Sequence, residues 1–127
     1  MVAHRRATHV VSENERVRDA VAAIAQGQWD RMGGLMRASH RSLRDDYEVS
    51  CRELDLLAEL ATAERGVYGA RMTGGGFGGC VILLVETDQR EAVADSISDQ
   101  YHDRIGWAPR CYLVQASAGA REICAAL

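Results

Sequence analysis

A cluster of glycines between two strand-like runs constrains the fold of this chain more than any other feature. Five of the six residues from 74 to 79 are glycine, and residues 80–85 then read Cys-Val-Ile-Leu-Leu-Val. An ordered glycine loses more backbone entropy than any other residue, so the cluster indicates positive φ angles or a close approach to the backbone. Successive amides in such a loop commonly form a concave site for an anion such as phosphate. The alternative is a hairpin turn of relaxed sequence.

The surrounding residues exclude the two best-known nucleotide loops. Gly74, Gly76 and Gly79 match the GxGxxG spacing, but that motif requires a helix directly after it, and residues 80–85 favour a strand. A Walker-type loop is excluded because the chain has no lysine, all 15 basic residues being arginine. We therefore predict strands over 67–72 and 80–85, joined by the glycine loop.

Two side chains next to the loop are candidates for a binding role. Thr73 would offer a hydroxyl beside the amides. Arg71 could approach a phosphate as a charged fork, although an arginine on the solvent face of a strand is an equal alternative.

Helical spacing of apolar residues predicts four helices, near residues 13–26, 28–45, 51–65 and 89–104. Residues 12–15, 50–53 and 88–91 resemble capping boxes, and the first ten residues are expected to be extended. The Gly33-Gly34 pair within the second helix indicates close packing against a neighbouring element. Pro109 would open a last strand over 110–115.

This order of elements predicts an α+β domain, with helices on one face of a small, largely antiparallel sheet. Residues 80–85 are apolar throughout, as in a strand that is buried on both faces. Three strands and these helices leave sheet surface uncovered, so we expect another domain or partner to complete it.

The segment from Ser39 to Ser50 concentrates polar side chains between two predicted helices. His40 and Arg44 share a helical face, four residues apart. Asp45 or Asp46 could act as a general base, but a solvated helix end is the simpler interpretation. His4, His9 and His102 show no partner spacing. The residues thus indicate a loop that helps to bind phosphate, and give no catalytic set and no metal site.

Composition narrows the cellular setting and the partners. A net charge of −3 argues against nucleic acid or an anionic membrane, and no run approaches the length of a membrane span. The four cysteines form no CxxC pair, and Cys80 and Cys111 are expected to be buried free thiols. We expect a reduced, cytoplasmic protein.

Three blocks of sequence resemble the galactokinase branch of the GHMP kinases, in the order of that family. Residues 66–80 resemble its third, glycine-rich motif, and residues 9–17 resemble the stretch that enters its C-terminal domain. Residues 39–55, with Ser-Leu-Arg-Asp-Asp-Tyr-Glu-Val-Ser over 42–50, resemble a further block that favours galactokinase over other members. Together the blocks cover essentially the whole chain.

The resemblance implies a GHMP-kinase C-terminal domain of ferredoxin-like, α+β type over residues 1–127. It implies an intact enzyme that uses ATP and Mg²⁺ to phosphorylate the C1 hydroxyl of α-D-galactose in galactose catabolism. The predicted loop of the substrate cleft comprises Thr73, Gly74, Gly75, Gly76, Phe77, Gly78 and Gly79.

Two motifs of that family have no counterpart in this chain. These are the sugar-contacting first motif and the ATP-cradling second motif, and the catalytic Asp of the family maps to no residue of the chain. We therefore predict an incomplete galactokinase that lacks its N-terminal ATP- and sugar-binding domain and is inactive alone. The alternatives are a non-catalytic sugar-sensing or ligand-binding module, or a different GHMP kinase such as a homoserine or mevalonate kinase.

Overall fold

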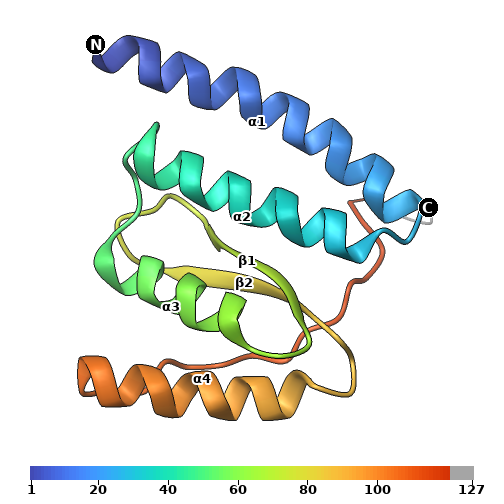
Figure 1. The fold of residues 1–127 in the computed structure, drawn as a ribbon, viewed down its shortest axis with the longest axis vertical. Coiled ribbons are helices and arrows are strands. Elements are labelled where there is room, and N and C mark those ends of the chain that lie inside the picture. The colour runs from blue at the N-terminus through green and yellow to red at the C-terminus, as the bar shows by residue number, and fades with distance from the viewer. Residues whose placement is uncertain (121–127) are drawn as a thin grey trace, which may run out of the picture.

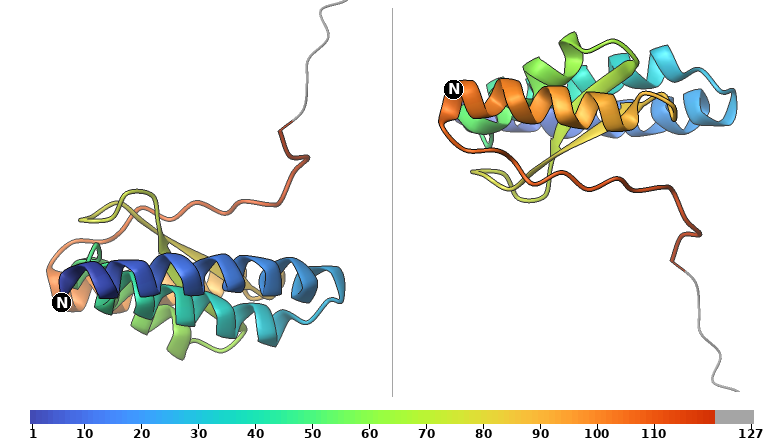
Figure 2. Two further views of the ribbon diagram at one scale, coloured as in Figure 1. Left: turned by 90° about the horizontal axis from the view of Figure 1, so that it is seen from above. Right: turned by 90° about the horizontal axis from the view of Figure 1, so that it is seen from below.

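The computed structural model describes residues 1–120, which fold as an α+β domain of four helices and one antiparallel hairpin (Figure 1). The elements follow one another as α1 (Val2–Ala25), α2 (Trp29–Asp45), α3 (Arg52–Ala63), β1 (Val67–Thr73), β2 (Cys80–Val85) and α4 (Arg90–Ile105). The glycine loop and the extended segment after α4 project from the side of the molecule opposite α3 (Figure 2). The fold class agrees with the prediction.

Helix α1 begins eleven residues earlier than the sequence pattern suggested, at Val2 instead of residue 13. The predicted extended start was wrong because residues 2–25 contain neither glycine nor proline, so nothing interrupts the helix. Ser12 lies inside this helix, where its Oγ donates a hydrogen bond to the carbonyl oxygen of His9 at 3.2 Å instead of capping. The predicted capping boxes at Ser50 and Asp88 are also wrong: α3 and α4 have Cys51 and Gln89 at their N-caps, without a capping side-chain bond.

The packing predicted for the glycine pair in α2 is confirmed at one of its two positions. A Cβ atom on Gly33 would overlap the carbonyl group of Tyr68, and one on Gly69 would overlap the backbone of Gly33. The backbones of α2 and β1 therefore touch at Gly33 and Gly69. Gly34 faces only the tip of Arg37, 3.8 Å from its hypothetical Cβ.

Two adjoining clusters of buried side chains form the core. One joins α3, β1 and α4 through Ala58, Ala61, Ala70, Val93 and Ile97. The other joins α2, α3 and β1 through Leu43, Leu54 and Met72. Val81 of β2 packs against both clusters, so the hairpin that carries the glycine loop is fixed to three helices.

The sheet is smaller and more open than expected. Residues 110–115, predicted as a strand, run without regular secondary structure, and the sheet of the described residues consists of β1 and β2 alone. No residue of β2 is fully buried, and Ile82 is 47% exposed, so this strand is not buried on both faces. Cys80 and Cys111 are exposed free thiols rather than buried ones, and Cys124 lies outside the described residues. The expectation failed because a strand with one partner keeps an open edge and an uncovered face.

Candidate functional site

The candidate site is the loop that joins β1 to β2, from Thr73 to Gly79. Thr73 and Cys80 form the last pair of the hairpin, and both are exposed. Positive φ angles occur in turn at Gly74, Gly76, Phe77, Gly78 and Gly79. L-residues rarely adopt this conformation, so the geometry accounts for four of the five glycines. Gly75 has no positive φ, and a Cβ atom there would meet no atom within 4 Å.

The loop is held in place by the segment between α2 and α3. The amide of Phe77 donates a hydrogen bond to the carbonyl oxygen of Val49 at 2.7 Å. A Cβ atom on Gly76 would lie 2.8 Å from the Cβ of Val49 and would overlap its carbonyl oxygen. This contact leaves the side chain of Phe77 76% exposed, pointing out of the molecule. The loop is therefore docked on the protein at its centre, while its two ends are open.

Helix α1 in turn fixes the segment that carries Val49. Glu48 has φ of 59°, and its carboxylate accepts hydrogen bonds from Arg5 at 2.9 Å and from Arg6 at 2.6 Å. Arg6 also donates to the carbonyl oxygen of Asp46 at 2.6 Å. The hydrogen bonds from the two arginines hold the pKa of the Glu48 carboxyl below its usual range.

A buried chain of hydrogen bonds continues from α1 into the same segment. The Oγ of Ser42 donates to Asp46 at 2.8 Å, so the Nδ1–H of His9 is the donor in its 3.0 Å bond to Ser42. The His9 ring also stacks on Tyr47, with ring centroids 4.7 Å apart. Burial lowers the pKa of His9. The charges of Glu13 and Asp46 act to raise this pKa, and those of Arg16 and Arg71 act to lower it further. His9 is thus a neutral structural residue that links α1 to α2.

His40 connects α2, β1 and α3 directly beneath the hairpin. Its Nδ1 accepts a hydrogen bond from the amide of Met72 at 3.1 Å, so its Nε2–H donates to Asp55 at 3.1 Å. Ser50 donates to the same oxygen of Asp55 at 2.6 Å. Burial lowers the pKa of His40, although Asp55 acts in the opposite direction. Because both ring nitrogens are engaged, His40 positions β1 and is not free to exchange a proton with a substrate.

Arg71 is turned toward α1 rather than toward the loop. Its guanidinium lies 3.4 Å from a carboxylate oxygen of Glu13 and donates to the backbone oxygen of Met72 at 2.9 Å. Ser39 and Arg16 donate to Glu13 at 2.5 and 2.7 Å. Burial raises the pKa of Glu13, but these hydrogen bonds outweigh it and hold the pKa below its usual range. Arg71 is about one-third exposed and keeps part of its surface free.

The acidic residues considered as bases have other partners. Asp45 is exposed and paired with Arg44 at 2.7 Å, and this hydrogen bond lowers the pKa of its carboxyl. Asp46 accepts the hydrogen bond from Ser42. His4 is exposed, and His102 is exposed beside Asp103. No group of three or more His, Cys, Asp or Glu side chains among residues 1–120 is arranged to hold a metal ion.

The site thus consists of backbone held in an unusual conformation, without an associated nucleophile and base in the part of the chain described. Its open amides suit an anion. Sequence reasoning missed Val49 and Glu13, whose roles depend on contacts between distant segments. A backbone carbonyl acceptor such as that of Val49 leaves no signal in the sequence. No helix of residues 1–120 combines the length and apolarity needed to span a membrane.

Comparison with known proteins identifies the domain. The family model described as "GHMP kinases C terminal" matches residues 20–103, which include α2, α3, the hairpin and most of α4.

Two relatives of known sequence are galactokinases. The galactokinase of Bos taurus is 51% identical over 121 residues, which are 95% of this chain and 30% of the relative. The galactokinase of Homo sapiens is 51% identical over 120 residues, which are 94% of this chain and 30% of the relative. The chain thus spans about 30% of the length of these relatives.

Solved structures agree with this assignment. A galactokinase of Lactococcus lactis, complexed with galactose, superposes with a TM-score of 0.81 and 45% identity, covering 85% of this chain and 28% of that one. The L. major mevalonate kinase in complex with R-mevalonate superposes with a TM-score of 0.61 and 34% identity, covering 68% of this chain and 26% of that one. The chain therefore belongs to the GHMP kinases, whose C-terminal domain it carries.

Proposed function

We propose that this protein is the C-terminal part of a galactokinase, which transfers the γ-phosphoryl group of ATP to the C1 hydroxyl of α-D-galactose. The observation that carries the proposal is the glycine loop, whose positive φ angles and Val49 anchor hold exposed amides in one arrangement. Identity of about half over nearly the whole chain to galactokinases supports the choice of sugar.

The loop would contribute positioning and electrostatic stabilisation. Phosphoryl transfer depends mainly on these two effects, and backbone amides stabilise a developing negative charge without having to reorganise. The loop that fits this role comprises Thr73, Gly74, Gly75, Gly76, Phe77, Gly78 and Gly79. Within it, the amide of Phe77 is engaged with Val49 and anchors the loop. ATP supplies the phosphoryl group, and the described residues offer no cluster of acidic ligands for Mg²⁺.

The remaining groups would come from polypeptide that resembles the rest of the galactokinase chain. An exposed apolar stripe on α1 supports such a partner, because Val10, Val17, Val21 and Ile24 recur at helical spacing and are each at least 50% exposed. We infer that the 127-residue protein alone does not phosphorylate galactose. We also infer a cytoplasmic location from the cysteine pattern, and no nucleic-acid or membrane partner from the net charge of −3.

A chimera tests the proposal. In the Lactococcus lactis galactokinase, the part matched by this chain would be replaced by this chain, and galactose-dependent ADP release would be measured. The chimera is expected to turn over galactose. Gly76→Val is expected to lower kcat by about tenfold or more, because the Val49 contact can no longer form and the amides move.

Two controls make the result decisive. Gly34→Ala changes a glycine outside the loop whose Cβ would make only an ordinary contact with the tip of Arg37, and it is expected to keep the activity of the chimera. The 127-residue protein is expected to show no turnover above a buffer blank. Turnover by that protein alone, or a chimera that is folded but inactive on galactose, would refute the proposal.

A further inference from the structure

The chain reverses its direction just after α2 through one residue with a left-handed backbone. Glu48 has φ of 59°, a conformation that glycine usually supplies shortly after a helix. A residue with a side chain adopts it only at a cost in free energy. The reversal brings the amide of Val49 back to the carbonyl oxygen of Leu43 at 3.0 Å, and it directs the carbonyl group of Val49 at the glycine loop.

Two arginines from the first turns of α1 stabilise this reversal. Arg6 donates from one nitrogen to the carbonyl oxygen of Asp46 and from another to the carboxylate of Glu48, both at 2.6 Å, so it bridges the two ends of the turn. Arg5 donates to both oxygens of the same carboxylate, at 2.9 and 3.3 Å. Figure 1 shows the start of α1 beside the end of α2, where these residues meet. We call the side chains of Arg5, Arg6 and Glu48 the clasp.

The clasp reaches the glycine loop through a single residue. Val49 follows Glu48 directly, and its carbonyl oxygen accepts the 2.7 Å hydrogen bond from the amide of Phe77. Gly76 packs against the same residue with no room for a Cβ atom. A change in the backbone angles of Glu48 would therefore move the Val49 carbonyl group and, with it, the centre of the loop.

The exposure of the clasp separates this role from a contribution to stability. The side chains of Arg5 and Glu48 are 44% and 42% exposed, so they do not fill the core. Exposed ion pairs stabilise proteins only weakly, and glycine would adopt the angles of residue 48 without strain. A glutamate at this place is explained by its carboxylate, whose two oxygens can accept from two guanidinium groups at once.

We propose that Arg6 and Glu48 are positioning residues for phosphoryl transfer. They hold the turn after α2, which directs the Val49 carbonyl group at Phe77 and thereby sets the arrangement of the loop amides. Arg5 supports them by occupying the other carboxylate oxygen. The effect on turnover rests on the proposed function, whereas the effect on the loop does not.

A second ion pair of the same kind provides a matched control. Arg31 and Asp19 lie 3.1 Å apart and are 47% and 53% exposed, and they join α1 to α2 at the opposite ends of those helices. Arg31→Gln, the control variant, removes an exposed ion pair without touching the turn. Glu48→Gly and Arg6→Gln are the clasp variants.

Nuclear magnetic resonance of the 127-residue protein tests the geometry. Scalar coupling across a hydrogen bond falls steeply as the bond lengthens, and it does not depend on the free energy of unfolding. We expect coupling between the Phe77 nitrogen and the Val49 carbonyl carbon in the parent and in the control variant, and its loss in both clasp variants. Retention in Glu48→Gly would overturn the proposal, because the backbone angles alone would then suffice. Absence of the coupling from the parent would overturn it as well.

Two lysine substitutions separate the roles of the arginines. An arginine donates from several nitrogens in a rigid fork, whereas a lysine carries one ammonium group. Arg5→Lys is expected to keep the coupling, because Arg6 still bridges the turn, and Arg6→Lys is expected to lose it. Equal coupling in these two variants would contradict the bridging role of Arg6.

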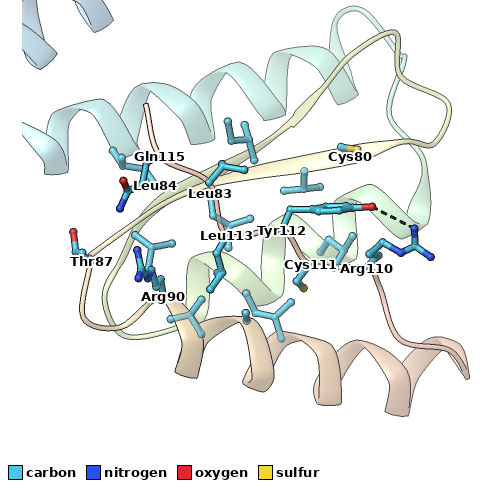
Figure 3. Close-up of a pocket in the computed structure, with 18 of the residues that line it drawn as sticks. Cys80, Leu83, Leu84, Thr87, Arg90, Arg110, Cys111, Tyr112, Leu113 and Gln115 are labelled. Atoms are coloured by element: carbon cyan, nitrogen blue, oxygen red, sulfur yellow. Dashed lines mark hydrogen bonds between the residues drawn. The ribbon is translucent and has the colours of Figure 1, made fainter. Parts of the chain in front are cut away.

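Thiol labelling with peptide mapping reports on the turn independently. Cys51 lies two residues after Val49 and is half-buried, so release of the turn should expose it. The clasp variants are expected to label Cys51 at least about threefold faster than the control variant does. Cys111 is the reference, since it is already exposed beside a cavity of about 460 Å³ along β2 (Figure 3). Equal Cys51 rates, relative to Cys111, in clasp and control variants would contradict the proposal.

Steady-state kinetics of the chimera described above tests the effect on turnover. The clasp variants are expected to lower kcat about three- to tenfold, because displaced amides stabilise the developing charge less well. The KM for galactose is expected to stay within about twofold, as for an interaction that acts in the transition state alone. The control variant is expected to keep both values. Equal kcat values in the clasp and control variants would overturn the proposal.

Failure of this inference can be told apart from failure of the proposed function. Loss of the coupling in the clasp variants, together with a folded parent chimera that is inactive on galactose, would support the clasp and refute the activity. An active chimera whose clasp variants keep both the coupling and kcat would refute the clasp alone.

Discussion

Gly76→Ala should destabilise the protein while Gly75→Ala should not, although the two residues are adjacent in one loop. Gly76 has φ of 84°, and its hypothetical Cβ overlaps the carbonyl oxygen of Val49. Gly75 has neither constraint. The pair therefore separates the geometry of one position from any general effect of placing alanine in a glycine-rich loop.

The expected magnitude follows from two terms. A non-glycine residue at left-handed φ costs roughly 1–2 kcal/mol. Displacing Val49 also weakens its 2.7 Å hydrogen bond from Phe77, and such a bond contributes about 0.5–1.5 kcal/mol net. The sum is about 1.5–3.5 kcal/mol, which corresponds to a fall in Tm on the order of 10 °C for a domain of this size.

Thermal unfolding followed by circular dichroism measures this difference directly. The Gly75→Ala protein is expected to melt within about 2 °C of the parent, since a surface change without strain or contact is worth at most about 0.5 kcal/mol. Equal melting temperatures for the two variants would mean that Val49 does not hold the loop. The loop geometry on which the proposed function depends would then be wrong.

Three further predictions test other parts of the structure. Gly33→Ala should unfold the domain or lower its Tm far more than Gly76→Ala does, because the added Cβ would overlap the Tyr68 carbonyl. Gly34→Ala should instead raise the free energy of unfolding by up to about 1 kcal/mol, and urea titrations would measure both effects. Burial lowers the folded-state pKa values of His40 and His9, so the unfolded chain binds more protons, and the free energy of unfolding should keep its full value above about pH 6.5 and decline below it. His40→Gln should flatten that decline, as measured by urea titrations at about pH 7.5 and 5.5. Cys80 and Cys111 should react with a thiol reagent faster than the half-buried Cys51, and equal rates by peptide mapping would contradict the exposed positions of the first two.

The elements that could be predicted from sequence are those whose partners lie nearby in the chain. The hairpin follows from two apolar runs around a short glycine loop, and α2 and α3 follow from helical spacing. The start of α1 was missed because Ser12 and Glu15 imitate a helix start in the middle of a helix. A capping pattern indicates only where a helix could begin. In an uninterrupted helix, the backbone amides at that point are paired within the helix and need no cap.

The site was only partly predictable for a related reason. Glycines report the loop conformation directly, because only they adopt several positive φ angles in succession without strain. The contacts that hold the loop lie between residues far apart in sequence, such as Phe77 with Val49 and Met72 with His40. Residues 110–115 are the opposite case. Their strand-like pattern is local, but a strand also needs a neighbour, and no residue within 1–120 pairs with them.

The candidate site depends on contacts that are made within this chain. The glycine loop is anchored entirely within this chain, by Val49 on one side and by His40 beneath β1. Among the described residues, the other edge of β2 has no partner strand. It follows that the loop is formed before any partner binds. Inactivity of the 127-residue protein would then reflect the catalytic groups it lacks, and the Gly76 and Gly75 variants can be interpreted in that protein alone.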